Sequence, residues 1–244
     1  MASIRLFLTL LLCLAALPAL ADDAQIRKVI ESKLGGVRVE SIQPAPIKGL
    51  FEVRFRTHQG PQIVYTDAQA TNIIVGSIYD ARTDRNLTEE QMNKLLAIDF
   101  GSLPLRDAVK ITRGNGRRVL AMFSDPYCPA CQSFEKQLAR VNDITIYVFM
   151  YPVIHPELTE QSRSVWCSPD RAKAWLDLAL RGRKPTAAPD CETPIDRNLA
   201  LGAELGINST PTLFLADGAR LRGGLATAAL EKTLDAVAIA TPKK

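Results

Sequence analysis

Two cysteines with two residues between them, Cys128-Pro129-Ala130-Cys131, stand at the junction of an apolar stretch and a stretch with helical periodicity. The apolar stretch, residues 118–123, predicts a strand, and residues 130–140 predict a helix. A second apolar stretch at 144–151 predicts another strand, and this order of elements requires a right-handed crossover between parallel strands. The cysteine motif therefore belongs to an α/β domain that contains a parallel pair of strands.

The position of the motif at the start of a helix favours thiolate chemistry. Unpaired backbone N–H groups and the positive end of the helix dipole stabilise a sulfur anion there and lower the pKa of the thiol. We therefore expect Cys128 to be the nucleophile that attacks a substrate disulfide. Cys131, one helical turn further on, is expected to resolve the mixed disulfide that Cys128 forms. Pro129 costs no hydrogen bond, since the first N–H groups of a helix have no intrahelical partner.

Two other uses of the motif compete with redox chemistry. A CxxC sequence is also half of a structural zinc site, which Cys167 and Cys191 would complete. Zinc ribbons usually bring their second cysteine pair close together, however, and a helix that starts inside the first pair suits redox chemistry better. A purely structural disulfide between Cys128 and Cys131 would close so small a loop that it restrains the unfolded chain very little. Redox chemistry without a metal remains the prediction.

Residues 1–21 have the pattern of a secretory signal peptide. Arg5 precedes an apolar run from Leu6 to Leu17, and the segment ends in Ala19-Leu20-Ala21. A membrane span needs about 20 apolar residues, so no stable membrane insertion is expected. Cleavage removes Cys13 and leaves an exported chain with these cysteines: Cys128, Cys131, Cys167 and Cys191.

Cys167 and Cys191 are predicted to form a structural disulfide, because an oxidising compartment lets disulfides persist. Closing a loop of about 25 residues removes ~3 kcal/mol of unfolded-state entropy in the chain-entropy model. The pair lies around residues 159–182, a charged and helix-prone stretch that predicts a helical insertion. A second redox pair is the rival interpretation, although neither cysteine sits in a strand-to-helix turn.

The N-terminal part predicts a small α+β unit. Residues 24–34 predict an amphipathic helix, and residues 50–56, 62–66 and 72–77 predict an antiparallel sheet with turns at 58–61 and 66–68. So small a unit buries little surface, and it contains no cysteine that could form a stabilising disulfide. We therefore expect it to gain stability by self-association. Thr88-Glu89-Glu90-Gln91 then predicts a capping box at the start of a connector helix.

The C-terminal part completes the α/β domain. Its predicted elements are a helix that starts at Thr193-Pro194, a strand at 212–215, a hairpin turn at Asp217-Gly218 and a last helix through Leu230, Leu234 and Val237. The net charge is +4 and the basic residues are scattered, so nucleic acid is not an expected partner. His58 and His155 lie far apart in sequence, and no metal is predicted.

Thr210-Pro211 lies between a predicted helix and a predicted strand, where the thioredoxin fold places a cis-proline loop beside the reactive sulfur. A signal peptide, a small sheet domain, a connector helix, a domain with CxxC and Thr-Pro, and a second cysteine pair together resemble the bacterial DsbC/DsbG family of periplasmic thiol:disulfide interchange proteins. The resemblance covers residues 22–244. Local matches are Asp22-Asp23-Ala24, Ile42-Gln43-Pro44-Ala45-Pro46, Gly-Ser-Ile-Tyr-Asp at 76–80, and Phe123-Ser124-Asp125.

The resemblance implies an architecture. Residues 22–84 would form a cystatin-like α+β dimerisation domain, 85–100 a linker helix, and 101–240 an α/β thioredoxin-like domain with a helical insertion. The family forms V-shaped homodimers in the periplasm, receives electrons from the membrane reductase DsbD and acts on misfolded exported proteins that contain disulfides.

It also implies residue roles. Cys128 would be the attacking thiolate and Cys131 the resolving thiol, with no cofactor beyond this redox-active pair. Thr210 and Pro211 would contact the substrate backbone, Cys167 and Cys191 would form the structural disulfide, and Gly76 would lie near the dimer interface.

The motif departs from the family at two points. Pro129-Ala130 replaces the Gly-Tyr of many DsbC members and the Pro-Tyr of DsbG-like ones, and it lacks the His of strongly oxidising DsbA-like proteins, so we expect a less oxidising site than theirs. Met122 stands where thioredoxins carry a buried Asp, so that position offers no proton acceptor for Cys131.

The predicted function is periplasmic disulfide isomerisation or reduction through a CxxC thiolate. Two alternatives stay open at this point. A DsbG-like reductase would restore cysteines oxidised to sulfenic acid. A holdase would use the same chain as a chaperone that binds exposed apolar surface without redox chemistry.

Overall fold

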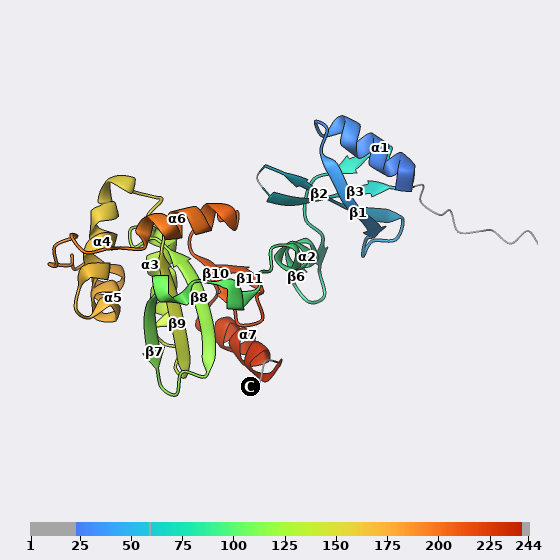
Figure 1. Ribbon diagram of the computed structural model, residues 1–244. Coiled ribbons are helices and arrows are strands. Elements are labelled where there is room, and N and C mark those ends of the chain that lie inside the picture. The colour runs from blue at the N-terminus through green and yellow to red at the C-terminus, as the bar shows by residue number, and fades with distance from the viewer. Residues whose placement is uncertain (1–22, 59, 241–244) are drawn as a thin grey trace, which may run out of the picture. The chain divides into compact units, whose positions relative to one another are not determined.

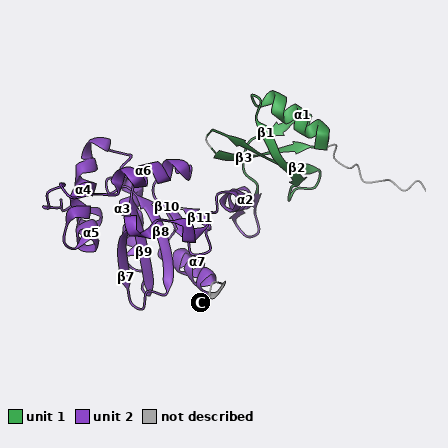
Figure 2. Cartoon of the chain, in the orientation of Figure 1, with its two compact units in different colours: residues 1–78 green, residues 79–244 purple. Residues whose placement is uncertain are grey.

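The computed structural model describes residues 23–58 and 60–240 (Figure 1). The predicted signal peptide, residues 1–21, lies outside the described residues. The chain divides into two compact units, unit 1 up to Ile78 and unit 2 from Tyr79 (Figure 2). Among the described residues, no helix is long and apolar enough to cross a membrane.

In unit 1, one helix covers one face of an antiparallel sheet. The strands pair in the order β1-β2-β3-β4. Ile26 and Ile30, four residues apart on the helix, are fully buried in a cluster with Val53 and Phe55. The elements are α1 (Asp23–Lys33), β1 (Arg38–Pro44), β2 (Leu50–Thr57), β3 (Gly60–Asp67) and β4 (Ile73–Ile74).

The sequence predicts α1, β2 and β3 correctly but misses β1. This strand lies at the edge of the sheet, which tolerates Pro44. A register irregularity between Val39 and Ser41 also breaks the alternation of buried and exposed residues that would have indicated a strand. The predicted turn at 58–61 is too long, since Gly60 already pairs in β3, and the predicted strand at 72–77 shrinks to Ile73–Ile74.

Unit 2 contains a five-stranded sheet with the order β11-β10-β8-β9-β7. Strands β8 and β9 are parallel, as predicted, and the other neighbours are antiparallel. The elements before α3 are β5 (Tyr79–Asp80), β6 (Arg85–Asn86), α2 (Leu87–Leu95), η1 (Phe100–Ser102), η2 (Leu105–Asp107), β7 (Val109–Arg113) and β8 (Arg118–Ser124). The others are α3 (Pro129–Leu138), β9 (Ile144–Met150), η3 (Pro156–Leu158), α4 (Thr159–Cys167), α5 (Arg171–Arg181), α6 (Ile195–Glu204), β10 (Thr212–Leu215), β11 (Arg220–Arg222) and α7 (Thr227–Ala240).

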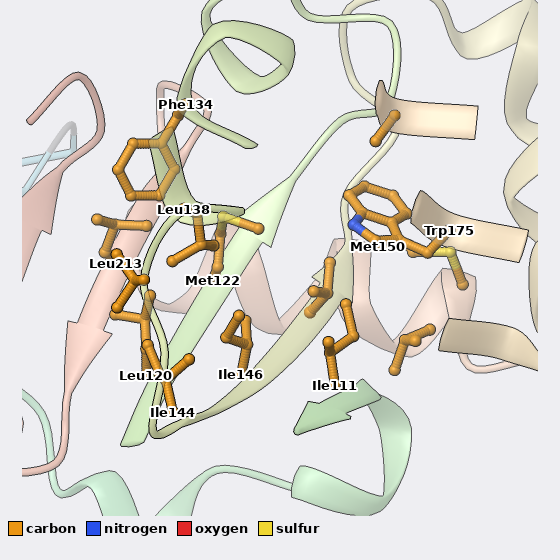
Figure 3. Close-up of a cluster of buried hydrophobic side chains, with 14 of the residues drawn as sticks. Ile111, Leu120, Met122, Phe134, Leu138, Ile144, Ile146, Met150, Trp175 and Leu213 are labelled. Atoms are coloured by element: carbon orange, nitrogen blue, oxygen red, sulfur yellow. The ribbon is translucent and has the colours of Figure 1, made fainter. Parts of the chain in front are cut away.

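Side chains from both faces of this sheet are buried. On one face, Phe134 and Leu138 of α3 pack toward Met122 and Ile146 (Figure 3). Trp175 of α5 joins the same cluster (Figure 3). On the other face, the rings of Phe123 and Phe149 stack with centroids 4.7 Å apart. The sheet therefore holds the C-terminal end of β8, where the cysteine motif begins, in a rigid framework.

Most elements predicted for unit 2 are confirmed: β8, α3, β9, the helices within 159–182, β10 and α7. Strand β7 was not predicted. The predicted capping box is wrong, because the N-cap residue of α2 is Asn86, whose side chain accepts a hydrogen bond from the Glu89 N–H, while Thr88 lies inside the helix. Likewise Thr193 does not cap α6; Pro194 holds that position, and the Thr193 hydroxyl accepts a hydrogen bond from Arg163.

Candidate active site

Cys128 is the N-cap residue of α3, and Cys131 lies one turn further into the helix. Pro129 occupies the first turn, where a missing N–H costs nothing. Neither cysteine forms a disulfide, and the exposed fractions are 6% for Cys128 and 1% for Cys131. The motif is thus a reduced dithiol whose first sulfur is the more accessible one.

The loop before β10 lies against the motif. Strand β10 pairs with β8 so that Thr212 stands opposite Phe123, which places residues 210 and 211 beside the end of β8. The Thr210–Pro211 peptide bond is cis. The Cys128 thiol donates a hydrogen bond to the Thr210 carbonyl oxygen, with a sulfur–oxygen distance of 3.4 Å. Tertiary structure therefore brings Cys128 and Cys131 together with Thr210 and Pro211.

The surroundings of Cys128 stabilise its thiolate. Burial acts to raise the pKa of Cys128, but the nearby Thr210 hydroxyl, the N–H and thiol of Cys131 and the Ala130 N–H favour its thiolate and together outweigh burial. The pKa of Cys128 is consequently lowered from its ordinary value. This is the electrostatic property that a thiol nucleophile needs near neutral pH.

Cys131 has the opposite property. Deeper burial raises the pKa of Cys131 well above its ordinary value, and the negative charge of a Cys128 thiolate adds to the rise. The nearby hydroxyls of Ser124 and Thr210 and the Asp125 N–H oppose this rise without cancelling it. Of two sulfurs one helical turn apart, Cys128 therefore has the lower pKa and is the one that more readily forms a thiolate.

Asp125 organises the loop that carries Cys128. Its side chain is fully buried, and its Oδ1 accepts a hydrogen bond of 2.8 Å from the Tyr127 N–H. Its Oδ2 accepts one of 2.8 Å from the Ile154 N–H, and its backbone oxygen accepts one of 3.2 Å from the Cys128 N–H. Asp125 thus links the loop that carries Cys128 to the loop that follows β9.

The remaining predicted site residues lie elsewhere. Cys167, at the end of α4, and Cys191, ahead of α6, form a disulfide with Cα atoms 5.7 Å apart. A zinc site made of all four cysteines is inconsistent with this bond, and no group of His, Cys, Asp or Glu in residues 23–58 and 60–240 has the arrangement of a metal site. Gly76 follows β4 in unit 1, and a Cβ at Gly76 would meet no atom within 4 Å.

Sequence reasoning missed two residues that shape the site, Ser124 and Asp125, and one buried charge on the same helix as Cys131, Glu135. Asp125 and Ser124 are quoted above only as part of a local match, although a polar pair that directly follows a buried strand is a signal of a strand-end site. Glu135 was not singled out. A charged residue at four positions after Cys131, inside the apolar stripe of a helix, is a signal of a buried polar interaction.

Comparisons with known proteins agree with this geometry. Residues 105–238 match a family described as Thioredoxin-like domain, and residues 17–89 match one described as Disulfide bond isomerase protein N-terminal domain. A protein from Bordetella pertussis, "Probable thiol:disulfide interchange protein DsbC", is 38% identical over 219 residues, which cover 88% of this chain and 76% of the relative. The "Thiol:disulfide interchange protein DsbC" of Escherichia coli K12 is 28% identical over 211 residues, 84% of each chain.

A solved structure gives the same result for the fold. A disulfide interchange protein from Neisseria gonorrhoeae superposes with a TM-score of 0.54 and is 36% identical in sequence. The match covers 56% of this chain and 99% of that one.

Proposed function

Because the chain belongs to the DsbC family of thiol:disulfide interchange proteins, we propose that it is a disulfide isomerase that rearranges wrongly paired disulfides in exported proteins. One observation carries the proposal: Cys128, with its lowered pKa, lies against the Thr210 carbonyl at the start of α3. The relatives named above favour isomerisation over the DsbG-like reduction of sulfenic acids.

The first route is rearrangement through a mixed disulfide. The Cys128 thiolate attacks one sulfur of a substrate disulfide; a bond forms between that sulfur and Cys128, the substrate S–S bond breaks, and the second substrate sulfur leaves as a thiolate. That thiolate attacks another disulfide of the same substrate. A substrate thiolate finally attacks the mixed disulfide and expels the Cys128 thiolate, so that pairing changes without net oxidation or reduction.

The second route is resolution by Cys131. When rearrangement stalls, Cys131 loses its proton and attacks the Cys128 sulfur, which expels the substrate as a thiolate. The substrate leaves with two more electrons, and the protein leaves with a Cys128–Cys131 disulfide. Because burial raises the pKa of Cys131, its thiolate is scarce, which slows resolution and favours rearrangement.

The same family membership supports the cellular setting that we propose. The protein is exported by a signal peptide at residues 1–21, acts in the periplasm, and receives electrons from DsbD to reduce the Cys128–Cys131 pair. Unit 1 forms a homodimer near Gly76, and the dimer also acts as a holdase. Ile74 and Val75, which are 45% and 80% exposed next to Gly76, support an interface there.

The test is recovery of activity from a scrambled ribonuclease, using the chain from residue 22 with its Cys128–Cys131 pair reduced and its Cys167–Cys191 disulfide intact at the start. Wild-type protein should restore ribonuclease activity, and Cys128→Ser should not. Cys131→Ser should still rearrange the substrate but accumulate a covalent mixed disulfide, which non-reducing electrophoresis detects. Isomerisation is refuted if the wild type restores no activity while it reduces a peptide sulfenic acid rapidly; that result would establish the alternative reductase.

A further inference from the structure

Two aliphatic side chains beside the nucleophile are unusually exposed. Val153 and Ile154, in the loop after β9, are 39% and 46% exposed. They are the large aliphatic side chains exposed in the described part of unit 2. Neighbouring apolar side chains that are exposed near a reactive group are typical of a binding surface.

The loop is fixed close to Cys128 by the Asp125 carboxylate. One oxygen of that carboxylate holds the Ile154 N–H and the other holds the Tyr127 N–H, each at 2.8 Å. Tyr127 directly precedes Cys128, and the Cys128 N–H itself bonds to the Asp125 backbone oxygen. Ile154 and Cys128 are thus each one hydrogen bond from the same buried residue.

A second set of contacts holds the loop on either side of Ile154. The Tyr151 N–H donates to the Ser124 oxygen at 2.9 Å, which continues the pairing of β9 with β8 into the loop. The His155 ring meets the Tyr127 ring edge to face, with centroids 6.4 Å apart. Val153 and Ile154 are therefore presented by a loop that is anchored before and after them.

The occupant of this surface follows from the covalent chemistry. In the mixed disulfide the substrate is a polypeptide tethered to the Cys128 sulfur. Each residue of an extended chain advances about 3.3 Å, so the residues that flank the bonded cysteine lie near the segments that Asp125 ties to the Cys128 loop. Residues Tyr151 to His155 carry no Asp, Glu, Lys or Arg, and the nearby Glu157 carboxylate is engaged by the His155 ring at 3.0 Å, so Val153 and Ile154 offer an apolar contact.

We propose that Val153 and Ile154 form an apolar subsite for a side chain that flanks the substrate cysteine bonded to Cys128. The proposal rests on the isomerase function and adds a preference for substrate cysteines with apolar neighbours. Native disulfides usually lie in packed surroundings, whereas a wrongly paired cysteine exposes its apolar neighbours to the solvent. A subsite for those neighbours makes the protein react faster with misfolded than with native disulfides.

The test compares two peptides, Gly-Leu-Cys-Leu-Gly and Gly-Ser-Cys-Ser-Gly, each as a mixed disulfide with nitrothiobenzoate. The Cys128 thiolate attacks the peptide sulfur and expels the coloured nitrothiobenzoate anion, whose absorbance gives the second-order rate constant. The variant is Val153→Ser with Ile154→Ser, in the chain from residue 22 with only the Cys128–Cys131 pair reduced. Ile47→Ser is the matched control, since Ile47 is 49% exposed but lies in unit 1.

We expect the double variant to react about fivefold more slowly with the leucine peptide, and nearly unchanged with the serine peptide, because only the leucine side chains gain from apolar burial. Alkylation of Cys128 by iodoacetamide should keep its wild-type rate in every variant. Equal wild-type rates for the two peptides, or an equal loss of both in the double variant, would overturn the subsite. A wild type that prefers the leucine peptide but fails on scrambled ribonuclease would refute the isomerase function and leave the subsite standing.

Discussion

The indole N–H of Trp175 on α5 donates a hydrogen bond of 2.8 Å to Oε1 of Glu135 on α3, where both side chains are shielded from water. The other carboxyl oxygen, Oε2, has no hydrogen-bond partner among the described residues. Burial raises the pKa of Glu135 to about 7, although the hydrogen bond from Trp175 and the charge of Arg113 oppose the rise. The carboxyl group is therefore neutral at acidic pH and carries a poorly compensated charge above neutrality.

Glu135→Gln should make the domain less sensitive to pH. An unfolded Glu titrates near pH ~4.3, so between there and pH 7 the folded chain holds a proton that the unfolded chain has lost. The free energy of unfolding of the wild type should fall as pH rises through this window. Gln keeps an acceptor for Trp175 and cannot ionise, so its stability relative to the wild type should grow by about 3 kcal/mol from pH 4 to pH 8.

Urea unfolding at both pH values, followed by tryptophan fluorescence, measures this change. Glu160→Gln is the control, because the Glu160 side chain is 64% exposed. The raised pKa of Glu135 would be contradicted if the stability difference between Glu135→Gln and the wild type did not vary with pH.

Thr210→Val should raise the pKa of Cys128. The Thr210 hydroxyl stabilises the Cys128 thiolate, and valine keeps the shape of threonine without the hydroxyl. The rate of alkylation by iodoacetamide should fall at pH 6, roughly threefold for half a unit of pKa, and should match the wild type at high pH. Ser209→Ala, which removes an exposed hydroxyl from the same loop, is the control. A titration midpoint equal to that of the wild type would show that the hydroxyl has no effect.

Removal of the Cys167–Cys191 disulfide should destabilise unit 2 without changing Cys128. The bond joins residues 24 positions apart, and the chain-entropy model gives roughly 3 kcal/mol for a loop of this size. Cys167→Ala with Cys191→Ala should lower the urea midpoint, which Trp166 and Trp175 report by fluorescence because both lie in unit 2. The alkylation rate of Cys128 in native buffer should stay constant. A redox role for this pair would be indicated if that rate changed instead of the stability.

Gly76→Val should weaken dimerisation while leaving each chain folded. No atom of the single chain lies within 4 Å of a Cβ at Gly76, so a larger side chain has room there unless a second chain packs against it. Sedimentation velocity should show a higher dimer dissociation constant, with an unchanged circular dichroism spectrum. Thr71→Val, an exposed substitution nearby, is the control. A wild type that is monomeric at micromolar concentration would remove the dimer from the proposal.

Local patterns in the sequence were enough to predict α3, β8, β9 and the start of the helix at the cysteine motif, because periodicity and helix-start signals act over a few neighbouring residues. The same patterns failed for β1. That strand is a bulged edge strand, whose side chains do not alternate between core and solvent. The cap of α2 is Asn86 rather than the predicted Thr88, because the extended backbone at Asn86 lets its side chain accept from the Glu89 N–H.

The sequence alone predicted the roles of the two thiols, but it did not predict how far their pKa values differ. The order of Cys128, Pro129 and Cys131 at a helix start identifies a nucleophile and a resolving thiol from the helix dipole and the chain spacing alone. The gap between their pKa values depends on Thr210, 82 positions after Cys128, and on the depth at which α3 buries Cys131. Burial and long-range hydrogen bonds are set by how the whole sheet packs, so only the folded chain decides them.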